Sequence, residues 1–157
     1  MEKEVLLSAM KRSISEVLEK MFFLPVDFPA RGSKEDLPGS GSGKILATRL
    51  GFSGPFSGHF VFFSPEGLTA SLAASFLGED PGKVTAAHVS DTMKEIVNMI
   101  AGNTFSILDD QAIFDLAIPE ILEPFAGGKG SPGSEEGIFI LVQTIDNCLG
   151  LELVVKE

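Results

Sequence analysis

The sequence has few of the residues that build disulfides, metal sites or nucleic-acid interfaces. Its 157 residues include one cysteine, Cys148, which excludes an internal disulfide and leads us to expect a reducing compartment. Twelve lysines and arginines stand against 22 aspartates and glutamates, a net charge of -10. Because nucleic acids and anionic membranes would repel such a chain, we expect neither as a partner. We interpret Cys148, in a turn-like segment, as a bystander thiol.

Long apolar runs are also missing. No window approaches the ~20 apolar residues of a membrane span. The first residues include glutamates and no long apolar core, which does not match a signal peptide, so we expect a cytoplasmic protein. His59 lies in a strand pattern without a partner at metal-ligand spacing, and we expect no metal site. The segment 39–44, G-S-G-S-G-K, lacks the spacing and the Ser or Thr of a phosphate loop.

What the chain does contain is typical of one globular domain over residues 1–157, with 44% hydrophobic and 22% charged residues. Apolar periodicity predicts helices and strands in alternation. The predicted elements are a helix over 4–23 ended by Pro25, a hairpin of 44–52 and 58–64, a helix through Leu77 with Ser64 as N-cap and Gly78 as its end, a long helix from about 84 to Asp109, a strand over 112–118, and a hairpin of 137–145 and 149–155. Residues 30–43 and 126–134 are predicted loops.

The two halves of the chain share an order of elements, which indicates a degenerate repeat of about 1–80 and 81–157. Residues 57–63 align with 149–155 at an offset of 92. The repeat predicts an α/β (α+β) fold with pseudo-twofold symmetry, in which two long helices pack on an antiparallel sheet built from two hairpins.

The stretch over residues 90–103 carries the clearest functional signal. On a helix, Asp91, Glu95, Asn98 and Gly102 fall within an arc of about 60°. We call these four residues the outward stripe, because the apolar residues of the helix lie on the opposite side: Met93, Ile96, Val97, Ile100, Thr104, Ile107 and Leu108. A solvated helix face is one interpretation of the stripe. A binding face is the other, because Asn and Gly are poor helix formers.

The string D91-x-x-x-E95-x-x-N98-x-x-x-G102-N103 resembles the signature of the CheC/CheX/FliY family of chemotaxis phosphatases, and the single copy is most similar to CheX. The resemblance implies a CheC-like fold and an enzyme that accelerates hydrolysis of the aspartyl phosphate on a phosphorylated CheY-type response regulator. It implies that Glu95 anchors the partner through an active-site lysine and that Asn98 orients the attacking water.

Further expectations concern the surroundings of this site. We expect Asp91 and Gly102 to bind the partner. Each has a second interpretation: Asp91 as a residue that holds the start of the helix, and Gly102 as a helix-packing glycine. No cofactor of the chain's own is expected, and Mg²⁺ is expected in the receiver domain of the partner. The resemblance also implies a homodimer formed through sheet edges. Asn103 lies off the stripe, so we assign it a structural hydrogen bond.

The first long helix provides a test of how many sites the repeat carries. If it corresponds to the second, Glu16 matches Glu95, Glu19 falls at the position of Asn98, and Arg12 replaces Asp91. A carboxylate at the position of Asn98 would repel phosphoryl oxygens and a hydroxide-like water. We therefore predict one active site, in the second half.

Two other functions remain open from the residues. The same helix could bind a response regulator or a flagellar-switch protein as a non-catalytic adaptor, or the chain could be a dimerisation domain whose sheet edges need cover. Asn98 favours catalysis, because an adaptor does not require an amide at that position.

Overall fold

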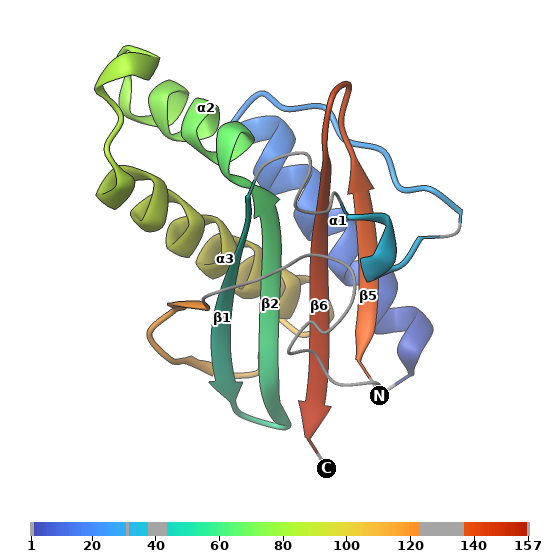
Figure 1. Cartoon of the computed structure of the whole chain (residues 1–157). Helices are drawn as coiled ribbons and strands as arrows, with labels where there is room; N and C mark the ends of the chain where they lie inside the picture. Colours follow the sequence, from blue (N-terminus) through green and yellow to red (C-terminus); the bar gives the residue numbers. More distant parts are fainter. Residues whose placement is uncertain (1, 31, 38–43, 123–136, 157) are drawn as a thin grey trace.

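A computed structural model describes residues 2–30, 32–37, 44–122 and 137–156. Figure 1 labels its larger elements. In chain order they are α1 Lys3–Met21, η1 Lys34–Asp36, β1 Ile45–Ser53, β2 Ser57–Pro65, α2 Glu66–Leu77, η3 Pro81–Lys83, α3 Ala86–Leu108, β3 Asp115–Leu116, β4 Glu120–Leu122, β5 Ile138–Gln143 and β6 Cys148–Lys156. None of the described helices is both long and apolar enough to cross a membrane.

The strands form one antiparallel sheet with the order β3-β1-β2-β6-β5, and β4 pairs with β1 as well. Its centre consists of the two hairpins, β1–β2 and β5–β6, joined by the β2–β6 ladder. The helices cover one face, with α1 behind β5 and β6 and α3 behind β1 and β2 (Figure 1). The predicted α+β arrangement of helices on a sheet of two hairpins is therefore confirmed.

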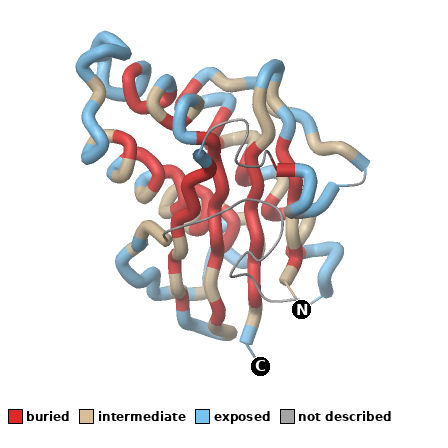
Figure 2. The backbone as a smooth tube through the Cα atoms, viewed as in Figure 1, coloured by how far each residue is buried: buried red, intermediate tan, exposed pale blue. Residues whose placement is uncertain are grey.

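The main core lies between the sheet and the helices. Phe60, Phe62 and Leu151 project from the central strands toward Ile14 and Ile100, and all five are fully buried. Each such side chain stabilises the fold by about 1.5–3 kcal/mol relative to leaving it in water. A smaller cluster on the other face includes Ile45, Val61, Phe63 and Leu141 and is covered in part by Leu37. Figure 2 shows the buried residues running through the strands and along the inner sides of the helices.

The alignment at an offset of 92 is wrong by one residue. It equates Phe60 with Glu152, yet Phe60 faces the helices whereas Glu152 lies between Leu151 and Leu153, which face the helices themselves. Successive strand residues point to opposite faces, so a slip of one residue exchanges the two faces. A pseudo-twofold axis perpendicular to the sheet keeps both long helices on one face. Equivalent strand residues of the two halves must then point to the same face, which requires an odd offset between their residue numbers.

The ends of several elements differ from the prediction for local reasons. Ser64 is not the N-cap of α2: Pro65 holds that position, and the Ser64 hydroxyl instead accepts a hydrogen bond from Thr69 Oγ1 at 2.8 Å. Helix α1 ends at Met21, before Pro25, because Phe23 adopts a left-handed conformation with φ 55°. Gly78 ends α2 with φ 69°, as predicted.

The region after α3 departs most from the predicted strand over 112–118. Within the predicted range the strand that pairs with β1 is limited to Asp115–Leu116, and the ring of Phe114 stacks on Phe105. The structure adds the short strand β4, which the sequence analysis left unassigned, and the helix η1 within the predicted loop 30–43. The Gly-rich segments 38–43 and 126–134 lie outside the described residues.

Candidate functional site

Helix α3 is the platform of the site, and both of its ends are fixed. At its start Thr85 and His88 form a capping box: His88 N donates to Thr85 Oγ1 and Thr85 N donates to His88 Nδ1, both at 3.1 Å. These bonds satisfy backbone donors that have no partner inside the helix. Asp109 closes the helix, with its backbone N–H bonded to the Phe105 carbonyl. The predicted end at Asp109 is therefore confirmed.

The inner side of α3 is buried against the sheet and α1. Met93, Ile96, Val97 and Ile100 are fully buried, as the apolar pattern predicts, while Ile107 and Leu108 are half-buried. The Ser13 hydroxyl of α1 donates to the Ile100 carbonyl at 2.7 Å, which ties the two long helices together inside the core. This packing fixes the rotation of α3 about its own axis and so determines which residues face outward.

The outward stripe lies on the solvent side of α3. Asp91 and Glu95 are exposed, and Asn98 and Gly102 are half-buried. Within the described part of the chain, the side chains of Asp91, Glu95 and Asn98 form no hydrogen bond or ion pair. Their carboxylates and carboxamide are therefore available to an incoming molecule. The structure brings together all four residues that the sequence singled out.

Gly102 is not a helix-packing glycine. A Cβ atom placed on it would have no atom within 4 Å apart from its immediate surroundings in the helix. A glycine that allows two helices to approach would instead show close contacts at that point. The missing side chain leaves the backbone of α3 open to solvent one turn beyond Asn98, which agrees with a binding role.

A shallow depression adjoins Gly102 at the end of the stripe, and we call it the α3 hollow. Its lining residues are Gly102, Phe105, Ser106, Asp109, Asp110, Ala112, Phe114 and Leu116. Ser106 and residues 112–116 are additions to the site that the sequence pattern did not predict. Helical spacing places Ser106 near the stripe, but the position of 112–116 depends on the stacking of Phe114 on Phe105, which no local pattern shows.

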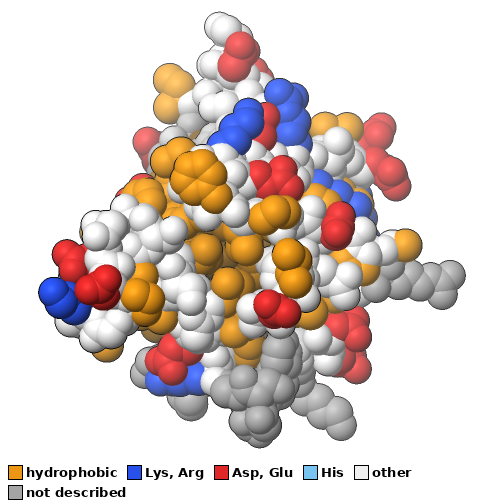
Figure 3. Space-filling model, turned by 90° about the horizontal axis from the view of Figure 1, so that it is seen from above, with side chains coloured by type: hydrophobic (Ala, Val, Ile, Leu, Met, Phe, Trp, Pro, Cys, Tyr) orange, Lys and Arg blue, Asp and Glu red, His pale blue; other side chains and the backbone are white. Residues whose placement is uncertain are grey.

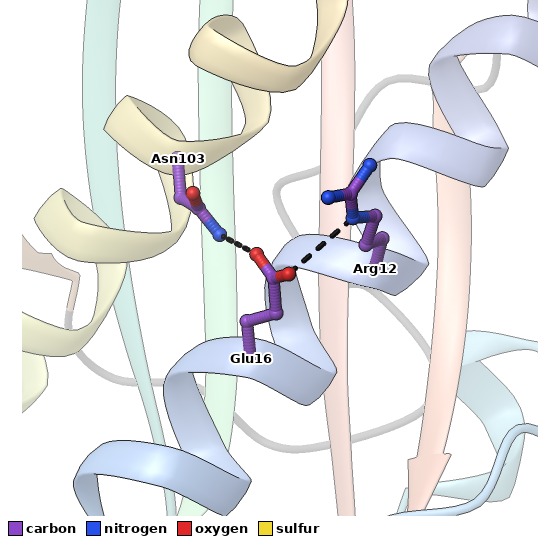
Figure 4. Close-up of polar contacts among 3 residues, drawn as sticks. All are labelled: Arg12, Glu16 and Asn103. Atoms are coloured by element: carbon purple, nitrogen blue, oxygen red, sulfur yellow. Dashed lines mark hydrogen bonds and ion pairs between the residues drawn. The ribbon is translucent and has the colours of Figure 1, made fainter.

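Asn103 makes the structural hydrogen bond predicted for it. Its Nδ2 donates to Glu16 Oε1 at 2.9 Å, and Arg12 Nε donates to Glu16 Oε2 at 3.3 Å (Figure 4). The hydrogen bond from Asn103 is the main reason that the pKa of Glu16 lies below its ordinary value, and Arg12 adds to this effect against the opposing desolvation. Glu19 accepts a hydrogen bond from Val26 N at 3.1 Å. Glu16 and Glu19, which align with Glu95 and Asn98, thus serve the fold.

Other candidate groups lie away from the stripe. Burial lowers the pKa of His59 in β2, with Arg49 and Lys156 adding to the effect, and its Nδ1 has no hydrogen-bond partner among the described residues. Cys148 is a free, half-buried thiol at the start of β6, next to the smaller cluster. The residues that the structure describes contain no group of three or more His, Cys, Asp or Glu that could hold a metal ion.

The sequence matches a known protein family. The family model described as chemotaxis phosphatase CheX matches residues 46–143, a range that contains the whole outward stripe. No curated protein matches the sequence.

Solved structures share the fold at low sequence identity. A chemotaxis protein CheX from Vibrio vulnificus has a TM-score of 0.73 and 21% identity over 96% of each chain. The CheX-CheY-BeF3-Mg²⁺ complex from Borrelia burgdorferi matches with a TM-score of 0.68 and 18% identity, covering 96% of this chain and 97% of that one. The FliM middle domain from Vibrio alginolyticus matches less well, with a TM-score of 0.54 and 11% identity over 98% and 91% of the two chains.

Proposed function

The chain belongs to the CheX family of chemotaxis phosphatases, and we propose that it accelerates hydrolysis of the aspartyl phosphate on a CheY-type response regulator. One observation carries this proposal: Glu95 and Asn98 stand on the solvent side of α3, one helical turn apart and without partners among the described residues. A carboxylate and a carboxamide in that arrangement can engage the same visiting molecule. The solved complex of a CheX with CheY supports the choice of partner.

Glu95 anchors the partner in this proposal. Its side chain is exposed on a helix whose rotation is fixed by the core, so a lysine of the receiver domain can approach it from solvent. An exposed ion pair contributes about 0–1 kcal/mol alone, and more once the interface closes around it. Glu95 therefore acts mainly on affinity. Asp91, one turn earlier, and Gly102, one turn after Asn98, extend the contact in both directions.

Asn98 positions the attacking water. Hydrolysis of an aspartyl phosphate requires water in line with the bond that breaks, and an amide can both donate to and accept from that water without titrating. Placing the attacking water with one side chain raises the rate of hydrolysis about a hundredfold, which corresponds to an activation barrier lower by ~3 kcal/mol. A carboxylate at this position would repel the phosphoryl oxygens, which is the reason an asparagine is required.

The proposal includes the setting of the reaction. We assign Mg²⁺ to the receiver domain of the partner, where it neutralises phosphoryl charge. Every contribution of this chain is then docking, water placement and exclusion of bulk water. We also propose a homodimer formed through a sheet edge, and a cytoplasmic location shared with the response regulator.

The test compares the proposed phosphatase with a non-catalytic adaptor. A receiver domain from the same organism, charged with acetyl phosphate and Mg²⁺, is mixed with wild type or Glu95→Ala, and phosphate release is followed over time. We expect acceleration by wild type, and a raised KM for Glu95→Ala. Binding of the charged receiver without faster phosphate release would establish the adaptor and refute the phosphatase.

The non-catalytic adaptor is the second candidate function, and the FliM middle domain shares the fold of this chain. That likeness extends to the fold alone. The match to the phosphatase family model across the stripe favours catalysis over this second candidate.

A further inference from the structure

We infer that the docking surface for the response regulator continues past Asn98 onto residues 109–118, where an apolar projection of the receiver domain, flanked by a lysine or arginine, occupies the α3 hollow. This inference rests on the proposed function and adds a second contact region to it. The occupant is a part of the same receiver domain that presents the aspartyl phosphate to Asn98.

The α3 hollow continues the outward stripe along one side of α3. Gly102 belongs to the outward stripe and also lines the hollow, and Ser106 and Asp109 follow it on the next two turns of the same side. No Cβ closes the space at Gly102. A partner whose phosphorylated residue lies against Asn98 therefore covers the hollow with the adjoining part of its surface.

An apolar surface lies beside the hollow. Ile113 is 80% exposed and Ile118 is 88% exposed, while Leu116, which lines the hollow, is 36% exposed. Three aliphatic side chains are therefore exposed within the six residues 113–118, and a partner that covers the hollow would bury apolar surface on this segment.

This segment is held in place. The ring of Phe114 stacks on Phe105 with centroids 3.9 Å apart and planes within 4°. Ala117 N donates to the Gly51 carbonyl at 2.9 Å, and Leu116 pairs with Phe52 in the sheet. The exposed isoleucines therefore project from a braced segment, which lowers the entropy cost of ordering them on binding.

The charge around the hollow indicates which kind of side chain lies beside the apolar group of the partner. Asp109 and Asp110 line it, both are exposed, and no lysine or arginine is among its described lining residues. Asp109 Oδ1 accepts a hydrogen bond from Gln111 N at 3.0 Å, which keeps its carboxylate at the end of α3. A cationic side chain next to the apolar group would complement this rim, whereas a second copy of this acidic chain would be repelled by it.

The experiment titrates the Mg²⁺- and beryllofluoride-loaded receiver domain onto wild type, the double variant Ile113→Ser/Ile118→Ser, and the control Ile145→Ser. Ile145 is 90% exposed on the β5–β6 turn, at the opposite end of the sheet from β3. We expect the double variant to bind about tenfold more weakly, as the loss of two central apolar contacts implies, with an unchanged rate of phosphate release at saturation. Asp110→Asn should weaken binding to a smaller extent, and Ile145→Ser should bind as wild type does.

The outcomes separate this inference from the proposed function. Equal binding by wild type and the double variant overturns the inference and leaves the function intact. If wild type does not bind the loaded receiver, the proposed function fails and the inference fails with it. If Ile145→Ser weakens receiver binding as much as the double variant does, the inference is overturned. It is also overturned if the double variant loses self-association but still binds the receiver, because the exposed isoleucines would then join two copies of the chain.

Discussion

At the scale of single residues, the account depends on how little the protein itself uses the outward stripe. Asp91, Glu95 and Asn98 have no partners among the described residues, whereas Asn103, on the neighbouring side of the same helix, is bonded to Glu16. The two asparagines have opposite roles for a geometric reason: α1 lies against the side of α3 that carries Asn103, and solvent lies against the side that carries Asn98.

Gly102→Ala separates function from stability. Because the added Cβ meets no atom within 4 Å, the variant gains helix propensity, and its free energy of unfolding should rise by about 0.5–1 kcal/mol. The same methyl group occupies the space that a partner needs, so affinity for the activated receiver domain should fall several-fold. Chemical denaturation and a binding titration measure the two effects.

Gly67→Ala is the matched control for this prediction. Gly67 is an exposed residue of α2, and a Cβ atom there also meets nothing within 4 Å. It should leave receiver binding unchanged. Unaltered receiver affinity in Gly102→Ala would contradict a partner-binding role for Gly102.

The sequence could predict which residues of α3 share its outward side, because helical periodicity determines this. Asp91, Glu95, Asn98 and Gly102 lie together in the structure as the 3.6-residue repeat requires. It could not predict the hollow, because Phe114 reaches Phe105 only after the chain reverses between 109 and 114. The short hydrogen-bonded contact of Ser13 with Ile100 is likewise a result of tertiary packing.

At the scale of elements, the pair of long helices presents the site and the sheet supports the pair. α1 is bonded to α3 inside the core through Ser13 and at the surface through Glu16 (Figure 4). The Glu16 carboxylate accepts from Asn103 and Arg12, which favours its charged form and lowers its pKa. This interaction therefore stabilises the fold fully above the ordinary pKa of a glutamate, and the stabilisation is lost as the pH falls through the lowered pKa of Glu16.

Glu16→Gln tests that linkage. An amide retains an acceptor for Asn103 but does not titrate, so the variant should lose less stability than wild type between about pH 6 and pH 3. Urea denaturation at a series of pH values gives the slope of the free energy of unfolding against pH for wild type and for Glu16→Gln. In an Asn103→Ala background, Glu16→Gln should change the slope by a smaller amount, because the largest cause of the pKa shift has been removed. Parallel slopes for wild type and Glu16→Gln would contradict the assignment.

The elements predicted best were those with strong periodicity and clear end signals. α3 and the two hairpins were placed within a few residues, and Gly78 ends α2 through its left-handed conformation. β3 was overextended because its alternating apolar residues are typical of a strand, yet Ile113 and Ile118 face solvent and only two residues pair. The repeat alignment at an offset of 92 was wrong because similarity between amino acids does not show which face of a sheet each residue points to.

At the scale of the whole molecule, two surfaces remain for association. One is the outer edge of β5, where Gln143, paired with Asp27, is the one residue of the strand with a sheet partner on that side among the described residues. The other is the end of the molecule that carries the β5–β6 turn, where Figure 3 shows apolar side chains gathered among charged ones. Phe22 at the end of α1 and Phe76 near the end of α2 stack with ring centroids 5.1 Å apart, and the neighbouring Phe23 is 82% exposed.

The β5 edge gives the homodimer proposal a concrete form. The N–H of Gln143 points outward to Asp27, so strand alternation directs the N–H of Phe139 outward as well. Light scattering should give twice the monomer mass of 16.7 kDa for wild type and for Phe139→Ala. Phe139→Pro, which also lacks the N–H, should be monomeric. A wild-type monomer at concentrations of about 100 μM, well above a micromolar Kd, would refute the dimer.

The role of Asn98 is decided by the rate of phosphate release from the charged receiver domain at saturating Asn98→Ala. We predict that this variant binds the receiver as wild type does but loses about a hundredfold in rate, or ~3 kcal/mol, because the water is no longer placed. Asn98→Asp, which has the same shape with a negative charge, should also lose the acceleration. A wild-type rate in Asn98→Ala would contradict the account, since no other residue of the outward stripe is assigned the water.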